Sequence, residues 1–460
     1  MKINIRELLG FHTRFEFGEG GFAQYMTTVR DTRIENGVHD GAIVLSDTHQ
    51  KLIQRAQKQN ILHKDVGYVR ALRLSDSVYF YDVGLRTIDG NIFSRGTSLN
   101  LDEAVARAFG ELYERVSMRF VPANVGMVQK SYKQIQKEGI PVLPVEELAK
   151  ATKKQKDLFP ELIWDEGSPL SWVTAQNIHT GESTYVPAQL VYWEYRRFRG
   201  EPILREVNTS GLGAGYTNDE AIASAAGELV QRHSFFYFWY AKKTPPKISV
   251  VSLLESSHCS AEVRKLIEGV LHYGLTIHLV NCTLKDSAPS VAVILTKPGL
   301  GWFVGMSTSS SYEKAIERGV CEALSLYTWV LNNPEETVTP PFGVPNITEG
   351  FCDKSILSSV RIRAWSHQEI AKHGAFFLEG EEHSFEHMMT EEFTMMNALA
   401  TIADRKTYVV RATSSYLYDM GFHAVRVIAP HIHTLTYNEY NSTPILDGVE
   451  PKNTYPHPFP

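Results

Sequence analysis

The chain has 460 residues, of which 43% are hydrophobic and 21% charged, and its formal net charge is −6 at pH 7. This composition is typical of a globular protein and gives no sign of a general nucleic-acid binder. The opening segment MKINIRELLGFHTRFEF carries charges throughout, and no apolar run approaches the length of a membrane span. The four cysteines are scattered without a CxxC spacing, which argues against a structural zinc site or a disulfide framework. We therefore expect a cytoplasmic protein without nucleic-acid or membrane partners.

The first half of the chain predicts strands followed by a helix. Residues 66–97 alternate and are rich in Val, Tyr and Phe, which indicates strands joined by turns. A helix is expected to begin near Glu103, with Ser98, Asn100 or Asp102 as its cap.

The middle of the chain continues this mixture. Residues 128–160 are polar and rich in lysine, which is typical of a solvated helical surface or, alternatively, of a docking patch for an acidic partner. Residues 170–195 predict a hairpin. The glycine-rich stretch Gly211–Gly215 is expected to be a loop that leads into a second helix, capped by one of three residues: Thr217, Asn218 or Asp219.

The second half of the chain also predicts both strands and helices, in a less regular order. Residues 291–311 indicate two strands before a third helix with a cap near Ser311, residues 388–403 indicate another helix, and residues 421–430 an apolar strand. Because strands and helices alternate irregularly, the expected fold class is α+β with mixed sheets, rather than a doubly wound sheet.

A thirteen-residue pattern occurs twice in the chain. Residues 103–115 read EAVARAFGELYER and residues 220–232 read EAIASAAGELVQR, with eight identical positions and no gap. A weaker copy, AIERGVCE at 315–322, aligns Glu322 with Glu111. Each copy predicts a helix with small residues on one side, which permit close packing, and carboxylates and arginines on the other.

The repeat favours a site over an ordinary exposed helix face. Surface salt bridges at i,i+4 spacing contribute only ~0–1 kcal/mol, so they do not explain why the same residues recur in register. Converging carboxylates repel one another unless a cation lies between them, and arginine suits phosphate recognition. We therefore expect a Mg²⁺ and phosphate site with carboxylates as metal ligands and arginines at the phosphates: Glu111, Glu114, Glu220, Glu228, Arg232 and Arg318.

Two further segments leave alternatives open. The loop Gly211–Gly215 lacks the GKS or GKT ending of a P-loop, so it is either a tight turn before a helix or an anion site at a helix N-terminus. The chain ends in PHPFP, which is either a frayed tail or a rigid segment held in a pocket. In the second case the carboxylate of Pro460 would be a fixed acid/base group.

Taken together, these segments resemble the YcaO family, specifically its azoline-forming cyclodehydratases. The resemblance runs from about residue 95 to the end and depends on the order of five motifs: TSLNLDEAVARAFGELYER, NTSGLGAGYTNDEAIASAAGELVQR, EKAIERGVCEAL, GFHAVRVIAPHI and PHPFP. It implies a YcaO-type fold around a nucleotide site, with residues 1–95 as an N-terminal α/β part and residues 96–460 as the core and tail.

The resemblance also implies roles for individual residues. The family's Mg²⁺ carboxylates correspond to Glu111, Glu114, Glu220 and Glu228, its phosphate arginines to Arg232 and Arg318, and a glutamate beside the nucleotide to Glu322. Two positions near the nucleotide depart from the family pattern, because Arg107 stands where many members have Ser and Tyr216 where many have Asn.

The implied activity is ATP-dependent cyclodehydration of Cys, Ser or Thr in a precursor peptide to a thiazoline or oxazoline, with Pro460 as general base. The implied partners are an E1-like leader-binding protein and an FMN-dependent azoline dehydrogenase, in a complex that can include a homo-oligomer. Three alternatives stay open: a YcaO enzyme that forms a thioamide or amidine, another ATP-dependent ligase, and a non-catalytic scaffold.

Overall fold

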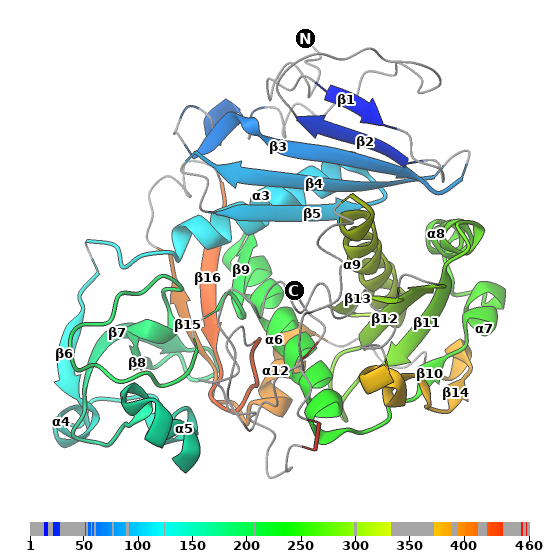
Figure 1. The fold of residues 1–460 in the computed structure, drawn as a ribbon. Helices are drawn as coiled ribbons and strands as arrows, with labels where there is room; N and C mark the ends of the chain where they lie inside the picture. The colour runs from blue at the N-terminus through cyan, green and yellow to red at the C-terminus, as the bar shows by residue number, and fades with distance from the viewer. Residues whose placement is uncertain are drawn as a thin grey trace. The chain divides into compact units, whose positions relative to one another are not determined.

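The structure is a computed structural model (Figure 1). It describes residues 13–16, 22–27, 61–75, 78–88, 92–332 without 124, 207, 299 and 300, 372–388, 394–412 and 421–435, with single positions between 51 and 58 and at 452, 453 and 457. The chain divides into two compact units. The first comprises Met1–Val116, Ser260–Thr276 and Ser414–Phe422, and the second Ser117–Cys259, Ile277–Thr413 and His423–Pro460. No described helix is long and apolar enough to cross a membrane.

Within the described residues, the first unit contains an antiparallel sheet of five strands together with helices. The strands pair in chain order: β1 (Thr13–Glu16), β2 (Phe22–Thr27), β3 (Leu62–Arg73), β4 (Tyr79–Thr87) and β5 (Phe93–Ser98). Its longer described helices are α3 (Leu101–Ser117) and α8 (Ala261–His272). The predicted strands and helix of this region are confirmed, and Asn100 caps α3 by accepting the backbone N–H of Glu103 at 3.2 Å.

The described part of the second unit contains two sheets. One has the order β13 (Gly301–Thr308), β12 (Ser290–Lys297), β11 (Thr276–Asn281), β10 (Lys247–Ile248) and β14 (Glu382–His383). The other has the order β6 (Val128–Ser131), β7 (Pro169–Asn177), β15 (Tyr408–Arg411), β16 (His423–Ile428) and β9 (Leu212–Gly215), with β8 (Ser183–Pro187) paired to β7. The main helices are α6 (Asn218–Ala241), α9 (Tyr312–Asn332) and α12 (Met395–Ile402), and the short ones α4 (Tyr132–Lys137), α5 (Lys153–Leu158) and α7 (Val250–Glu255).

Helix α6 packs against strands of both sheets in this unit (Figure 1). Its first half is rich in alanine, and Ala221, Ala225 and Leu229 pack with Val425 and Val427 of β16 in one buried cluster. Its second half is aromatic and packs in another cluster with β12, β13 and Phe377. This change of side-chain size along one helix lets α6 lie close to β16 at one end and fill a wide core at the other.

A strand glycine allows close packing at each of three strand–helix pairs. A Cβ on Gly96 would lie 2.0 Å from the Ala104 carbonyl oxygen, and one on Gly213 would lie 2.3 Å from that of Ala221. A Cβ on Gly305 would lie 2.2 Å from that of Gly319. The small residues of the repeat therefore serve backbone-to-backbone contact between strand and helix.

These contacts correct two predictions. Residues Leu212–Gly215 form strand β9, paired with β16, instead of a loop, because glycine lets this segment lie directly against α6. The third helix lies one turn out of the predicted register. The glycine contact places Glu322 beside Gly305 as it places Arg107 beside Gly96, so Glu322 does not correspond to Glu111.

Candidate functional site

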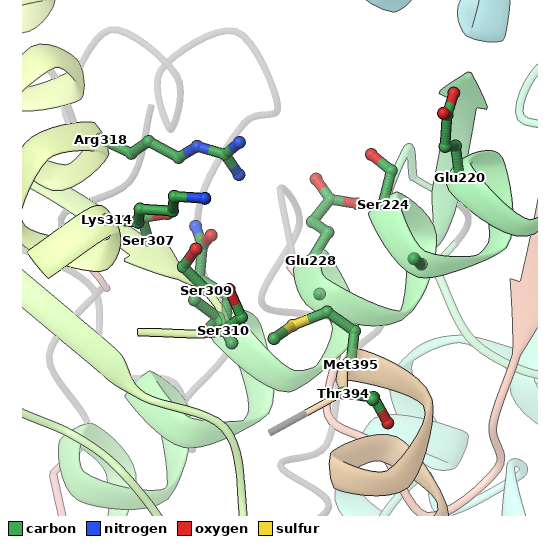
Figure 2. A pocket seen from close by; sticks show the side chains of 14 residues that line it. Glu220, Ser224, Glu228, Ser307, Ser309, Ser310, Lys314, Arg318, Thr394 and Met395 are labelled. Atoms are coloured by element: carbon green, nitrogen blue, oxygen red, sulfur yellow. The ribbon is translucent and has the colours of Figure 1, made fainter. Parts of the chain in front are cut away.

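A cavity of about 780 Å³ opens in the second unit between α6, β13, α9 and α12 (Figure 2). Helix α6 contributes one wall, the end of β13 and the turn after it the floor, and the first turns of α9 the opposite wall. The lining residues that carry charge or a hydroxyl are Glu220, Glu228, Lys314, Arg318, Ser224, Ser307, Thr308, Ser309, Ser310 and Thr394.

The α6 wall is acidic, and backbone amides hold its two carboxylates in place. Glu228 Oε2 accepts the N–H of Gly211 at 2.8 Å, and Glu220 Oε2 accepts the N–H of Tyr216 at 2.9 Å. Both bonds come from the strand and turn that lead into the helix. Thr217 caps the helix there by accepting the N–H of Glu220, which confirms one of the three predicted caps. The segment that precedes α6 therefore orients the carboxylates of Glu220 and Glu228.

The opposite wall is basic. Lys314 and Arg318 lie four residues apart, which places them on one face of α9. Ser311 starts this helix as predicted, because its Oγ accepts the N–H of Lys314 at 3.3 Å. Figure 2 shows the side chains of Lys314 and Arg318 directed across the cavity toward the α6 wall that carries Glu228.

This donor set fits a phosphorylated ligand with a divalent cation. Lysine and arginine with a row of hydroxyls provide hydrogen-bond donors for phosphate oxygens, and carboxylates are hard ligands of the kind that Mg²⁺ prefers. Glu220 and Glu228 are eight residues apart on the helix, or about 12 Å. Within the described part of the chain, no three His, Cys, Asp or Glu side chains gather as a metal-binding group. A cation here would accordingly be held by single carboxylates together with ligand phosphates.

The first copy of the repeat lies in the other unit. Glu111 accepts the N–H of Arg95 and pairs with Arg115 at 2.5 Å, while Arg107 pairs with Glu103 at 2.6 Å. Glu114 lies on the same helix and is half-buried. The metal site predicted to join Glu111 and Glu114 with the α6 carboxylates stays a prediction.

The other predicted residues of the nucleotide site are not among those that line the cavity. Arg232 lies on α6, and its Nη2 is 3.7 Å from Glu228 Oε1. Tyr216 is half exposed, and burial of its ring together with the charge of Glu220 raises the pKa of its hydroxyl. Glu322 is exposed on α9, and its Cβ faces Gly305. Pro460 lies outside the described residues.

Several residues that line the cavity were not predicted from the sequence. The sequence pattern assigned residues 291–311 to two strands, which is correct, yet gave no role to the hydroxyls of Ser307–Ser310 or to Lys314. The indication was present in the sequence as a run of hydroxyl residues directly before a helix whose first turns carry two cations.

The lysine-rich stretch forms a separate open groove of about 550 Å³, lined by Lys130, Lys133 and Lys137 together with Phe198. Lys130 binds the Glu138 carboxylate at 2.6 Å. Another cluster joins Glu147 to Lys406 at 2.6 Å and to His431 at 3.1 Å. The hydrogen bond that Lys406 donates to the Glu147 carboxylate is the main cause of the raised pKa of Lys406. His431 is thus engaged by a carboxylate within the same unit.

Comparison with known proteins identifies one family by sequence and structures of the same fold. A model of the YcaO family, described as YcaO cyclodehydratase, ATP- and Mg²⁺-binding, matches residues 95–433. The chain is 29% identical over 188 residues to an uncharacterised protein of Methanothermobacter thermautotrophicus, covering 39% of this chain and 46% of that one. It is 36% identical over 76 residues to an uncharacterised protein of Mycobacterium tuberculosis, covering 16% and 17%. The matched parts therefore span less than half of these curated relatives.

Solved structures share the fold at low sequence identity. One is a heterocyclase in complex with substrate and cofactor, with TM-score 0.62, 15% identity and coverage of 88% of this chain and 54% of that one. A second is YcaO from Methanopyrus kandleri bound with AMPPCP and Mg²⁺, with TM-score 0.58, 15% identity and coverage of 88% and 95%. A third is the E. coli microcin synthetase McbBCD complex with pro-MccB17 bound, with TM-score 0.56, 15% identity and coverage of 85% and 96%.

Proposed function

This chain belongs to the YcaO family, and on that premise we propose that it is an ATP-dependent cyclodehydratase that forms azolines in a precursor peptide. The observation that carries the proposal is the cavity of the second unit, where the carboxylates of α6 face the cations of α9 across a hydroxyl-lined floor. The heterocyclase and the AMPPCP-bound YcaO share this fold, which supports a nucleotide in this cavity.

The reaction that we propose removes one water per ring. The side-chain sulfur or oxygen of a Cys, Ser or Thr loses its proton to a general base, attacks the carbonyl carbon of the preceding amide and forms a C–S or C–O bond, while the carbonyl π bond opens onto oxygen. The former carbonyl oxygen takes the γ-phosphoryl group of ATP, and ADP leaves. The C–O bond to phosphate then breaks, the amide nitrogen loses its proton, and a C=N bond closes the azoline.

The residues of the cavity have separate tasks in this reaction. Lys314 and Arg318 bind phosphate oxygens and stabilise charge during phosphoryl transfer. Single carboxylates for Mg²⁺ would come from Glu220, Glu228, Glu111 and Glu114, with phosphate oxygens as further ligands. When bound, Mg²⁺ neutralises phosphate charge. Further groups around the nucleotide are Arg107, Tyr216, Arg232 and Glu322.

A general base must remove a proton from the nucleophile or the amide. We propose the carboxylate of Pro460 for this task, because the proline-rich segment PHPFP loses little entropy when it becomes ordered. The proposed partners are a precursor peptide, an E1-like protein that binds the peptide leader, and an FMN-dependent dehydrogenase that oxidises azolines to azoles. The microcin synthetase complex with pro-MccB17, which shares the fold, supports a peptide substrate and a multiprotein assembly.

Mass spectrometry of a Cys- and Ser-rich precursor peptide tests the proposal. The peptide is incubated with this protein, Mg-ATP and the E1-like partner, in parallel with Glu228→Gln and with Glu255→Gln, a control on the exposed surface of α7. We expect loss of one water per ring with the unchanged protein and the control, and no loss with Glu228→Gln. ATP consumption with a thioamide or amidine product would contradict azoline formation, and no ATP turnover with all partners present would indicate a scaffold.

A further inference from the structure

The lysine-rich groove lies beside a strand edge that has no partner strand among the described residues. Strand β6 pairs with β7 only, so its other edge is open in the part of the chain that the structure describes. Three consecutive residues of β6, Gln129, Lys130 and Ser131, line the groove. Neighbouring residues of a strand point to opposite faces of its sheet, so a groove that all three line runs along the strand edge. An extended peptide is the kind of ligand that such an edge accommodates.

Two cations of the groove lie on a helix that core packing holds in place. Lys133 and Lys137 are exposed and four residues apart on α4, so they share one face of that helix. The opposite face buries Tyr132 and Ile135, which pack in one cluster with Trp172 of β7. The two ammonium groups are therefore presented from a backbone whose position the core determines.

The positive charge of these lysines is only partly balanced within the described part of the second unit. Lys130 pairs with the Glu138 carboxylate at 2.6 Å. No described carboxylate forms an ion pair with Lys133 or Lys137, and no aspartate or glutamate is among the residues that line the groove. A ligand with carboxylates would therefore find two cations to pair with.

A second basic segment borders the groove. Phe198 lines the groove, and the exposed residues Arg197 and Arg199 flank it in the chain. On another side, Asp165 and Glu166 precede the lining residue Gly167, and Asp165 accepts the Gly167 N–H at 2.7 Å. Cations of the lining and its flanks thus outnumber the acids, and Phe198 adds an apolar surface between them.

Strand β7 relates the groove to the nucleotide cavity. Its Leu170 pairs with Lys130 beside the groove, and its Gln176, six residues further on, pairs with β15. The ladder from β15 through β16 reaches Gly211, whose N–H binds Glu228 on the cavity wall. Six residues of strand span about 20 Å. An extended peptide bound in the groove therefore needs at least about six residues to reach the cavity.

We propose that this groove binds an acidic segment of the precursor peptide and thereby brings residues at least about six positions away in that peptide to the nucleotide cavity. Carboxylates of the peptide pair with Lys133 and Lys137, its backbone follows the open edge of β6, and an apolar side chain contacts Phe198. The inference rests on the proposed function, which supplies the peptide substrate. It adds the chemistry by which that peptide is recognised and the part of the protein that recognises it.

Binding is tested by fluorescence anisotropy with labelled synthetic peptides that contain a run of glutamates, a Gly/Ser spacer and one Cys, and with twins that carry lysines in place of the glutamates. The unchanged protein is compared with a groove variant, Lys133→Glu with Lys137→Glu. The matched control is Lys150→Glu with Lys153→Glu, because these lysines are exposed in the same stretch and do not line the groove. Each reversal in the groove replaces an attraction by a repulsion, so we expect roughly tenfold weaker binding of the glutamate peptide to the groove variant. The control should bind like the unchanged protein, and all three should keep the same affinity for Mg-ATP.

Ring formation tests the reach of the bound peptide. With a spacer of about ten residues, the glutamate peptide should form rings faster than its lysine twin, and this gain should disappear in the groove variant. With a spacer of about three residues the glutamates should give no gain, because the Cys cannot reach the cavity while they occupy the groove.

Three results would overturn the proposal. They are equal affinity of the glutamate peptide for the groove variant and the control, an equal gain with short and long spacers, and tighter binding of an RNA oligonucleotide of the same charge. A groove variant that loses only the binding of the E1-like partner would also contradict it, since the groove would then hold a different occupant. A parent protein that forms no rings contradicts the proposed function instead, and the anisotropy measurement, which needs no turnover, then decides on the groove by itself.

Discussion

The backbone contact between β13 and α9 can be tested by adding one methyl group at Gly305. A Cβ there would lie 2.2 Å from the carbonyl oxygen of Gly319 and 2.4 Å from the backbone nitrogen of Ala323. Non-bonded heavy atoms settle at about 3.5–4.0 Å, so strand and helix must separate by about 1 Å or more. Because both contact atoms belong to the backbone, no side-chain rotation relieves the overlap.

The expected cost of Gly305→Ala is about 1–3 kcal/mol, as for other overpacked cores. Every residue of β13 is buried, so the strand has no exposed side toward which it can move. A shift of α9 also carries Lys314 and Arg318 away from the hydroxyls of the cavity floor. We therefore expect weaker Mg-ATP binding together with the loss of stability.

Gly110→Ala is the matched control, since nothing lies within 4 Å of a Cβ at that position in α3. The same added methyl group should there stabilise the protein by about 0.5–1 kcal/mol through helix propensity. Urea unfolding followed by far-ultraviolet circular dichroism measures both midpoints. A Gly305→Ala protein that unfolds at the wild-type urea concentration would refute the argument that these glycines are required by backbone contact.

Three further predictions concern charges. Glu228→Gln keeps an acceptor for the Gly211 amide but removes the negative charge, so the Mg²⁺-dependent part of nucleotide affinity should fall roughly tenfold, measured by titration against Glu255→Gln. Arg318→Ala removes a charge-assisted phosphate contact of about 1.5–3 kcal/mol, so affinity for ATP should fall roughly tenfold to hundredfold while that for adenosine stays the same. Burial raises the pKa of the Cys282 thiol, so folding favours the neutral thiol. Its contribution to stability is complete below the unfolded pKa of about 8.5 and declines as the pH rises above it, and a thiol reagent at pH 8 should modify Cys282 only after unfolding.

Patterns that depend on local chemistry were predictable from the sequence. Asn100, Thr217 and Ser311 were each among the expected helix starts, because the side chains of Asn, Thr and Ser satisfy the N–H groups of a first helical turn. The hairpin within residues 170–195 was predictable for the same reason, since alternation and turn residues are local properties.

Features that depend on distant contacts were not predictable. The segment Gly211–Gly215 has the composition of a loop, and its pairing with β16 depends on residues 423–426, far along the chain. The register of the third helix depends on where Gly305 meets α9, which no pattern of identities along the helix reveals. The cavity likewise joins residues of α6 to Lys314 and Thr394, whose proximity exists only in the folded unit.

Calorimetric titration of Mg-ATP into the unchanged protein, Arg318→Ala and Glu228→Gln tests the central claim, that the cavity of the second unit is the nucleotide site. The account predicts binding to the unchanged protein that requires Mg²⁺, a loss of affinity in both variants, and wild-type affinity in Glu255→Gln. Binding of Mg-ATP with equal affinity to all four proteins would contradict it, because the nucleotide would then lie elsewhere on the molecule.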